Sequence, residues 1–172
     1  PNEKMKIRNY DHRVGWFTVN KVDYSSDALK SDSFRLIRRW RLEPKNEEAY
    51  SRGELVEPKK QIVYYLDPAT PKKWRPYFIK GIEDWNSVFE KAGFKNTIVA
   101  KNPPSKEEDP NFSPEDIRYS TVRYVASETR NATGPSVSDP RTGEILESDI
   151  IWYHNHLRSY RNRYLLETGA AN

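Results

Sequence analysis

The segment QIVYYLDPATPKKWRPYFIKGIEDWNSVFEKAGFKNTIVA, residues 61–100, contains a strand pattern, a helix pattern and a second strand pattern in direct succession. Residues 62–66 are five consecutive apolar or aromatic residues, which are typical of a central strand covered on both faces. Residues 96–100 predict a second short strand directly after the helix pattern. Two strands joined this closely through a helix indicate a parallel crossover.

The middle of this segment repeats apolar side chains at spacings of three and four and predicts one helix over residues 74–92. Thr70 and Pro71 are a plausible cap and first-turn proline, but Pro76 keeps the regular helix from starting before about residue 74. Gly93 predicts a left-handed stop. We expect the apolar stripe to pack on the sheet, with a ligand groove as the alternative. The stripe comprises Trp74, Tyr77, Phe78, Ile82, Trp85, Val88, Phe89 and Ala92.

The rest of the chain adds strands and one more helix. Residues 117–127 predict a third strand, residues 133–152 a hairpin with its turn at 139–143, and residues 157–165 an amphipathic C-terminal helix. The predicted fold is therefore α+β (mixed α/β), a twisted mixed sheet of about four or five strands with one long helix packed on it. Residues 43–60 look like a surface loop or linker, which divides the chain into a linking N-terminal extension with strands, 1–58, and a main part, 59–172.

Composition narrows the classes of partner. The chain has 172 residues and no cysteine, which excludes disulfides and thiolate metal sites. No apolar run approaches the length of a membrane span, and no signal peptide is recognisable. Because the chain begins without Met, we expect it to be a piece of something longer.

The net charge of +4 is not concentrated. The 29 basic and 25 acidic residues are scattered along the chain, so we expect no nucleic-acid partner. Residues 34–42 alternate as a strand with one apolar face, built from Phe34, Leu36, Trp40 and Leu42. A nucleic-acid hypothesis through Arg35, Arg38, Arg39 and Arg41 predicts affinity that falls steeply with salt.

No complete active site is visible in the residues. His154 and His156 are two apart, whereas a zinc-binding helix needs ligands at i and i+4, as in H-E-x-x-H. That motif does not occur, nor does a nucleophile elbow or a phosphate loop. We therefore expect no metal site and no catalytic residue in this chain.

Four stretches together carry a resemblance to a known family. They are YDHRVGWF (10–17), RLIRRWRLEP (35–44), YYLDPATPKKWRPYFIKGIEDWNSVFEKAGF (64–94) and the segment from RYSTVRYVASETRNATGPSVSDP through YLLETGA (118–170). The last two resemble the catalytic region of large bacterial zinc-dependent metalloproteases with a metzincin-like fold. The first two resemble the segment that joins that family's N-terminal region to its catalytic domain.

The resemblance implies a fragment of a zinc metallopeptidase. In that family the zinc helix follows soon after the stretch that ends here, so zinc would belong to the parent protein and this chain alone would be inactive. Its partners would be a peptide or protein substrate and the remaining part of its own catalytic domain. The location would be secreted, periplasmic or associated with the cell envelope.

The resemblance also assigns a role to the predicted hairpin. In metzincin-like proteases an edge strand pairs antiparallel with the extended substrate. The matching strand spans residues 133–139, with residues 143–152 as its inner partner, and gives the substrate-binding residues Thr133, Gly134, Pro135, Ser136, Val137 and Ser138. Proline at this edge could instead only protect it from aggregation.

The alternative function is a binding module without catalytic activity. A self-contained binding module would grip a peptide or glycan through the hairpin edge or an aromatic surface. Its candidate contacts would include Trp16 and Trp152, which lie outside the helix stripe.

Overall fold

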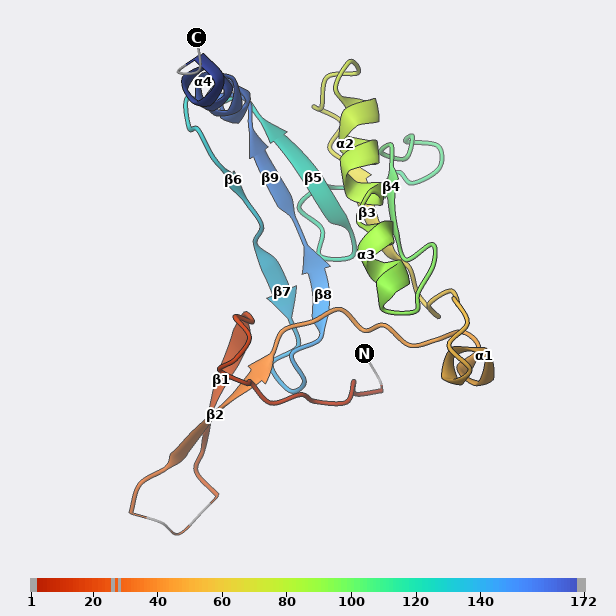
Figure 1. The fold of residues 1–172 in the computed structure, drawn as a ribbon, viewed down its shortest axis with the longest axis vertical. Coiled ribbons are helices and arrows are strands. Elements are labelled where there is room, and N and C mark those ends of the chain that lie inside the picture. Colours follow the sequence, from red (N-terminus) through yellow and green to blue (C-terminus); the bar gives the residue numbers. More distant parts are fainter. Residues whose placement is uncertain (1–2, 26, 28, 170–172) are drawn as a thin grey trace.

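The computed structural model describes residues 3–25, 27 and 29–169. Its main element is a five-stranded mixed sheet with the strand order β4-β3-β5-β9-β6. Two successive helices, α2 and α3, lie along one face of this sheet, and α4 lies at one end (Figure 1). The predicted α+β class, with a mixed sheet and a C-terminal helix, is therefore confirmed.

The predicted parallel crossover forms the centre of the sheet. Strand β3 (Ile62–Leu66) pairs in parallel with β4 (Ile98–Lys101), and Ile62 lies opposite Ile98. On its other side β3 pairs in parallel with β5 (Ser120–Val125). Leu66 and Val122 are among the least exposed side chains of the core, as expected for strands that are covered by a helix layer.

The single helix predicted over residues 74–92 is wrong, because the helix is broken in two. Helix α2 spans Arg75–Glu83 and α3 spans Asn86–Lys91. The break brings the Asn86 amide against β4, where it accepts from the N–H of Thr97 at 2.8 Å and donates to the carbonyl of Ile98 at 2.8 Å. This link connects the helix layer to the strand that follows it.

The two ends of the helical segment differ in how well they were predicted. The Thr70 cap is wrong: α2 begins at Arg75 after Trp74, which makes no capping hydrogen bond, and the buried Thr70 hydroxyl has no partner among the described residues. Pro76 lies in the first turn, where a missing N–H costs little. Gly93 has φ of +90° and ends the segment as predicted.

The far border of the sheet is built from short strands. Strand β9 (Ile150–Tyr153) is parallel to β5, and β6 (Ala132–Thr133) pairs antiparallel with β9. Strands β7 (Ser136–Ser138) and β8 (Ile145–Ser148) form a separate antiparallel hairpin. The continuous strand predicted over residues 133–139 is therefore split, since Pro135 has no N–H for the ladder.

The N-terminal part consists of a two-stranded hairpin followed by a short helix. Strands β1 (Thr18–Asp23) and β2 (Asp32–Ile37) form an antiparallel hairpin. The surface loop predicted over residues 43–60 contains helix α1 (Glu47–Ser51), and Ala49, Val56 and Phe94 form a small second core. The predicted apolar face is confirmed at Leu36, which is buried, but Phe34 is exposed.

The C-terminal helix α4 spans His156–Gly169 and buries none of its side chains fully. Among the residues that the structure describes, no helix combines the length and the apolar character needed to cross a membrane.

Candidate peptide-binding edge and aromatic groove

The six residues predicted to bind substrate lie together along one border of the fold. Thr133 belongs to β6, Gly134 and Pro135 connect the strands, and the remaining three residues form β7. Strands β6 and β7 follow each other along this border, and no described strand pairs with their outer side (Figure 1). Val137 is 43% exposed.

The register of β7 determines which backbone groups face outward. The carbonyl of Pro135 points inward, because it accepts from the N–H of Asp149 at 3.0 Å and from the hydroxyl of Ser148 at 3.2 Å. Successive residues of a strand direct their backbone groups to opposite sides. The N–H and carbonyl of Ser136 therefore face the open side.

One side chain from the N-terminal part reaches this strand. The guanidinium Nη2 of Arg38 donates to the carbonyl of Ser136 at 2.5 Å and also contacts the Ser136 hydroxyl. Arg38 has no carboxylate within salt-bridge distance among the described residues, and its buried Nε has no hydrogen-bond partner there. The sequence offered no signal for this contact, because 98 residues separate the two side chains.

The backbone on either side of Arg38 docks on the hairpin. Arg39 donates its N–H to the carbonyl of Gly143 at 3.0 Å and accepts from the N–H of Ile145 at 2.9 Å. In the turn, hydrogen bonds from Arg141 lower the pKa of Asp139 to about 2, so this carboxylate remains charged. The β7–β8 hairpin is thus stabilised by hydrogen bonds within its own turn and by backbone hydrogen bonds from the N-terminal part.

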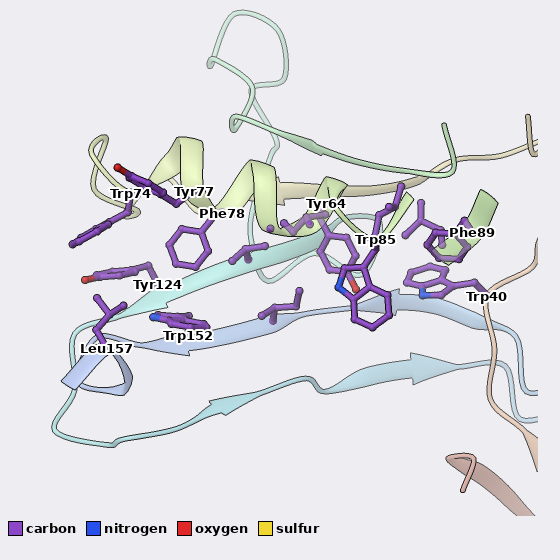
Figure 2. Close-up of a pocket in the computed structure, with 16 residues that line it drawn as sticks. Trp40, Tyr64, Trp74, Tyr77, Phe78, Trp85, Phe89, Tyr124, Trp152 and Leu157 are labelled. Atoms are coloured by element: carbon purple, nitrogen blue, oxygen red, sulfur yellow. The ribbon is translucent and has the colours of Figure 1, made fainter. Parts of the chain in front are cut away.

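A groove lined by aromatic side chains runs between the α2–α3 layer and the sheet. Its volume is about 760 Å³, within the range of small-molecule sites. Figure 2 shows aromatic rings from α2, α3 and the residues that flank them, facing rings from the strands. The aromatic lining consists of Trp40, Tyr64, Trp74, Tyr77, Phe78, Trp85, Phe89, Tyr124 and Trp152.

The two faces of this groove touch only along part of its length. Phe78 contacts the rings of Tyr124 and Trp152, with centroid separations of 6.4 and 5.6 Å. Tyr77 and Trp85, in contrast, are 69% and 58% exposed. The apolar stripe predicted for residues 74–92 therefore packs on the sheet at its centre and leaves a solvent-exposed aromatic surface beside it.

His154 and His156 contact different side chains and do not form a common site. His154 contacts the hydroxyl of Tyr124 through Nδ1 just after β9, whereas His156 begins α4 and packs between Trp152 and Tyr160. No group of three His, Cys, Asp or Glu side chains that could hold a metal occurs in the described part of the chain. The residues present do not fit a zinc site, because one imidazole is engaged by a phenol and the other by aromatic packing.

Two carboxyl groups meet beside the edge, on β8 and at the start of β9. Burial and the negative charge of Asp149 raise the pKa of Glu147 to about 7. Asp149 itself accepts from the N–H and the hydroxyl of the fully buried Thr121, at 2.9 and 2.6 Å. This pair was not found in the sequence, where 25 acidic residues hide any single couple.

The arginines of residues 35–41 do not form one continuous basic surface. Arg35 lies 3.8 Å over the ring of Tyr10, and Arg39 donates to the carbonyl of Lys6 at 2.6 Å. Arg41 forms an ion pair with Glu43 at 2.7 Å. Each guanidinium thus has its own local partner. The alternative contact candidates also separate: Trp152 lines the groove, whereas Trp16 lies outside it and is 48% exposed.

Comparison with known proteins covers only the N-terminal part. A family described as "Domain of unknown function (DUF5117)" matches residues 1–45. No curated protein and no solved structure matches the chain. The matched segment includes the β1–β2 hairpin and the arginine that contacts Ser136.

Proposed function

We propose that the chain forms the substrate-edge portion of a zinc-dependent metallopeptidase, with the catalytic part beginning near residue 59. Its role is to hold an extended peptide along β6 and β7 while zinc and a general base act on the scissile bond. Both of those groups belong to a part of the parent protein outside these 172 residues. The parent would act in a secreted, periplasmic or envelope location.

The observation that carries the proposal is the open edge of β7. The N–H and carbonyl of Ser136 face outward, and an extended peptide can pair with them as an additional antiparallel strand. A carbonyl oxygen has two lone pairs, so the bond from Arg38 leaves room for a peptide N–H. Gly134 and Pro135 leave the neighbouring edge low in side-chain bulk.

The aromatic groove supports the second part of the proposal, a partner from the same catalytic domain. Exposed apolar surface of this kind is usually covered by another element. In this proposal the remaining part of the catalytic domain packs on the groove and completes the core. The groove is then an internal surface of the parent protein.

The chemistry of the parent reaction is metal-assisted peptide hydrolysis. In the parent protein, a bound zinc would supply a water molecule of lowered pKa and would polarise the peptide carbonyl. The contribution of this chain is to bind and orient the peptide, through backbone hydrogen bonds at the edge.

A pair of variants at Ser136 tests the proposal. Because the Ser136 N–H faces away from β8, Ser136→Pro removes an outward donor without removing a ladder bond. Ser136→Ala keeps this donor and is the matched control. In a calorimetric titration with a capped extended peptide, we expect weak binding by the wild type and Ser136→Ala, and a loss of binding by Ser136→Pro. Equal binding by all three proteins would contradict the edge.

A second candidate function rests on the groove itself. Four of the five tryptophans line it, which favours a binding module that takes an apolar peptide segment or a glycan without chemistry. The indole N–H signals of Trp74, Trp85 and Trp152 separate the two candidates. A groove ligand shifts these signals, whereas a peptide at the edge leaves them in place.

A further inference from the structure

The guanidinium of Arg38 gives the edge a chemical preference. It is fixed on the carbonyl and the hydroxyl of Ser136, beside the outward-facing backbone groups. Its charge is not neutralised by any carboxylate within salt-bridge distance in the described part of the chain. Its Nε is buried and has no hydrogen-bond partner among the residues that the structure describes. The planar guanidinium of arginine binds carboxylates and phosphates preferentially, because its N–H donors match their geometry.

From this arrangement we infer that the edge selects an extended peptide carrying an aspartate or glutamate opposite Ser136. In an antiparallel pair, residues directly opposite each other point their side chains to the same face. The peptide residue opposite Ser136 therefore lies on the face where the Ser136 hydroxyl meets Arg38. An acidic side chain there supplies the missing negative charge.

The neighbouring peptide residues meet a different surface. They point to the opposite face, which carries the exposed Val137 and its cross-strand partner Glu147. That face favours apolar side chains and disfavours additional acidic ones. The expected motif is an acidic residue with an apolar residue on each side.

This inference rests on the proposed edge function. Binding of two peptides distinguishes the failure of the acidic preference from the failure of the edge function. The probes are capped seven-residue peptides of alternating Val and Thr, one with Asp and one with Asn at the central position. Binding is followed by the backbone amide signal of Ser136. We expect the Asp peptide to bind roughly fivefold to tenfold more tightly at low salt, and the difference to shrink at high salt.

Two arginine variants assign the preference to one side chain. Arg38→Gln is expected to bind both peptides equally. Arg35→Gln, which changes a cation held over Tyr10, is expected to keep the preference. Equal affinity of the wild type for both peptides overturns the inference and leaves the edge function standing, as does a preference that survives in Arg38→Gln. Failure of both peptides to shift Ser136 overturns the edge function and this inference together.

Discussion

Gly143 lies directly against the backbone carbonyl of Ile37, so closely that no Cβ atom fits between them. Its φ of +77° also belongs to the left-handed region that favours glycine. The turn of the β7–β8 hairpin and the end of β2 are thus fitted to each other at backbone level. This contact connects the segment matched by the domain family to the proposed substrate edge.

Replacing Gly143 with alanine should therefore lower the free energy of unfolding by more than the strain of its left-handed backbone alone would cause. Gly53 is the matched control, because it has φ of +82° but nothing within 4 Å of a Cβ position. Gly53→Ala should lower the free energy of unfolding by about 1 kcal/mol, and Gly143→Ala by at least about 2 kcal/mol, because the hairpin must move away from Ile37. Urea unfolding measures both. Equal costs would mean that the two segments do not depend on each other.

The carboxylate of Asp149 should be important for the start of β5. It accepts from both donors of Thr121, a residue with no exposed surface. Asp149→Ala leaves two buried donors unpaired and should lower the free energy of unfolding by about 2–3 kcal/mol. Asp149→Asn keeps one acceptor oxygen and should cost less. A loss below about 0.5 kcal/mol for Asp149→Ala in chemical unfolding would disprove this role.

Glu147 should make stability depend on pH. Burial, followed by the charge of Asp149, raises its pKa from 4.5 to about 7 in the folded chain. A carboxyl with a raised pKa stabilises the fold when protonated, so its contribution is complete below pH 4.5 and is lost as the pH rises through about 7. The partly exposed position limits the effect to about 1 kcal/mol.

The variant Glu147→Gln isolates this contribution from all others. Its free energy of unfolding, relative to the wild type, should rise between pH 5 and pH 8 by about 1 kcal/mol. Parallel curves for Glu147→Gln and the wild type would rule out the raised pKa.

The aromatic groove should make the isolated chain bind apolar dyes and associate with itself. Trp85 is 58% exposed at the groove, so Trp85→Ser should reduce dye fluorescence and self-association while changing the free energy of unfolding by only about 0.5 kcal/mol. Phe17→Ser removes a ring that is 82% exposed elsewhere and serves as the control. Dye binding that responds equally to both variants would mean that the groove is not the exposed surface.

If the zinc ligands lie in another part of the parent protein, as proposed, the chain by itself should neither retain zinc nor hydrolyse peptides. No described cluster of His, Cys, Asp or Glu offers three ligands, and H-E-x-x-H is missing from the sequence. After dialysis against trace zinc, elemental analysis should find much less than one zinc per chain. One bound zinc per chain, together with zinc-dependent cleavage of casein, would require an active centre around His154 and His156.

Period and length of the apolar patterns were sufficient to predict the parallel pair at the centre of the sheet, but not the strand order. The run at residues 62–66 and the run at 96–100 gave a parallel pair, because few other arrangements connect two buried strands through a helix. Gly93 marked the helix end correctly, since only a left-handed residue is needed there. The edge position of residues 133–139 was expected from the family resemblance, and Pro135 is consistent with it, but the division into β6 and β7 was not expected.

What could not be predicted depends on contacts between distant residues. The helix break near Asp84 and Trp85 is connected with the hydrogen bonds from Asn86 to β4, which no local periodicity records. The bond from Arg38 to Ser136 likewise spans two segments whose proximity only the fold creates. The groove was foreseen only as an alternative, because an aromatic stripe looks the same whether or not a sheet covers it completely.

The most direct test of the proposed peptide-binding edge is the hydrogen exchange rate of the Ser136 amide, measured with and without a saturating extended peptide. We expect the peptide to slow this exchange by about tenfold or more, because the outward N–H becomes a strand hydrogen bond. The indole N–H groups of the groove should exchange as before. An unchanged rate at Ser136, with protection at Trp74, Trp85 or Trp152 instead, would contradict the edge and establish the groove as the binding surface.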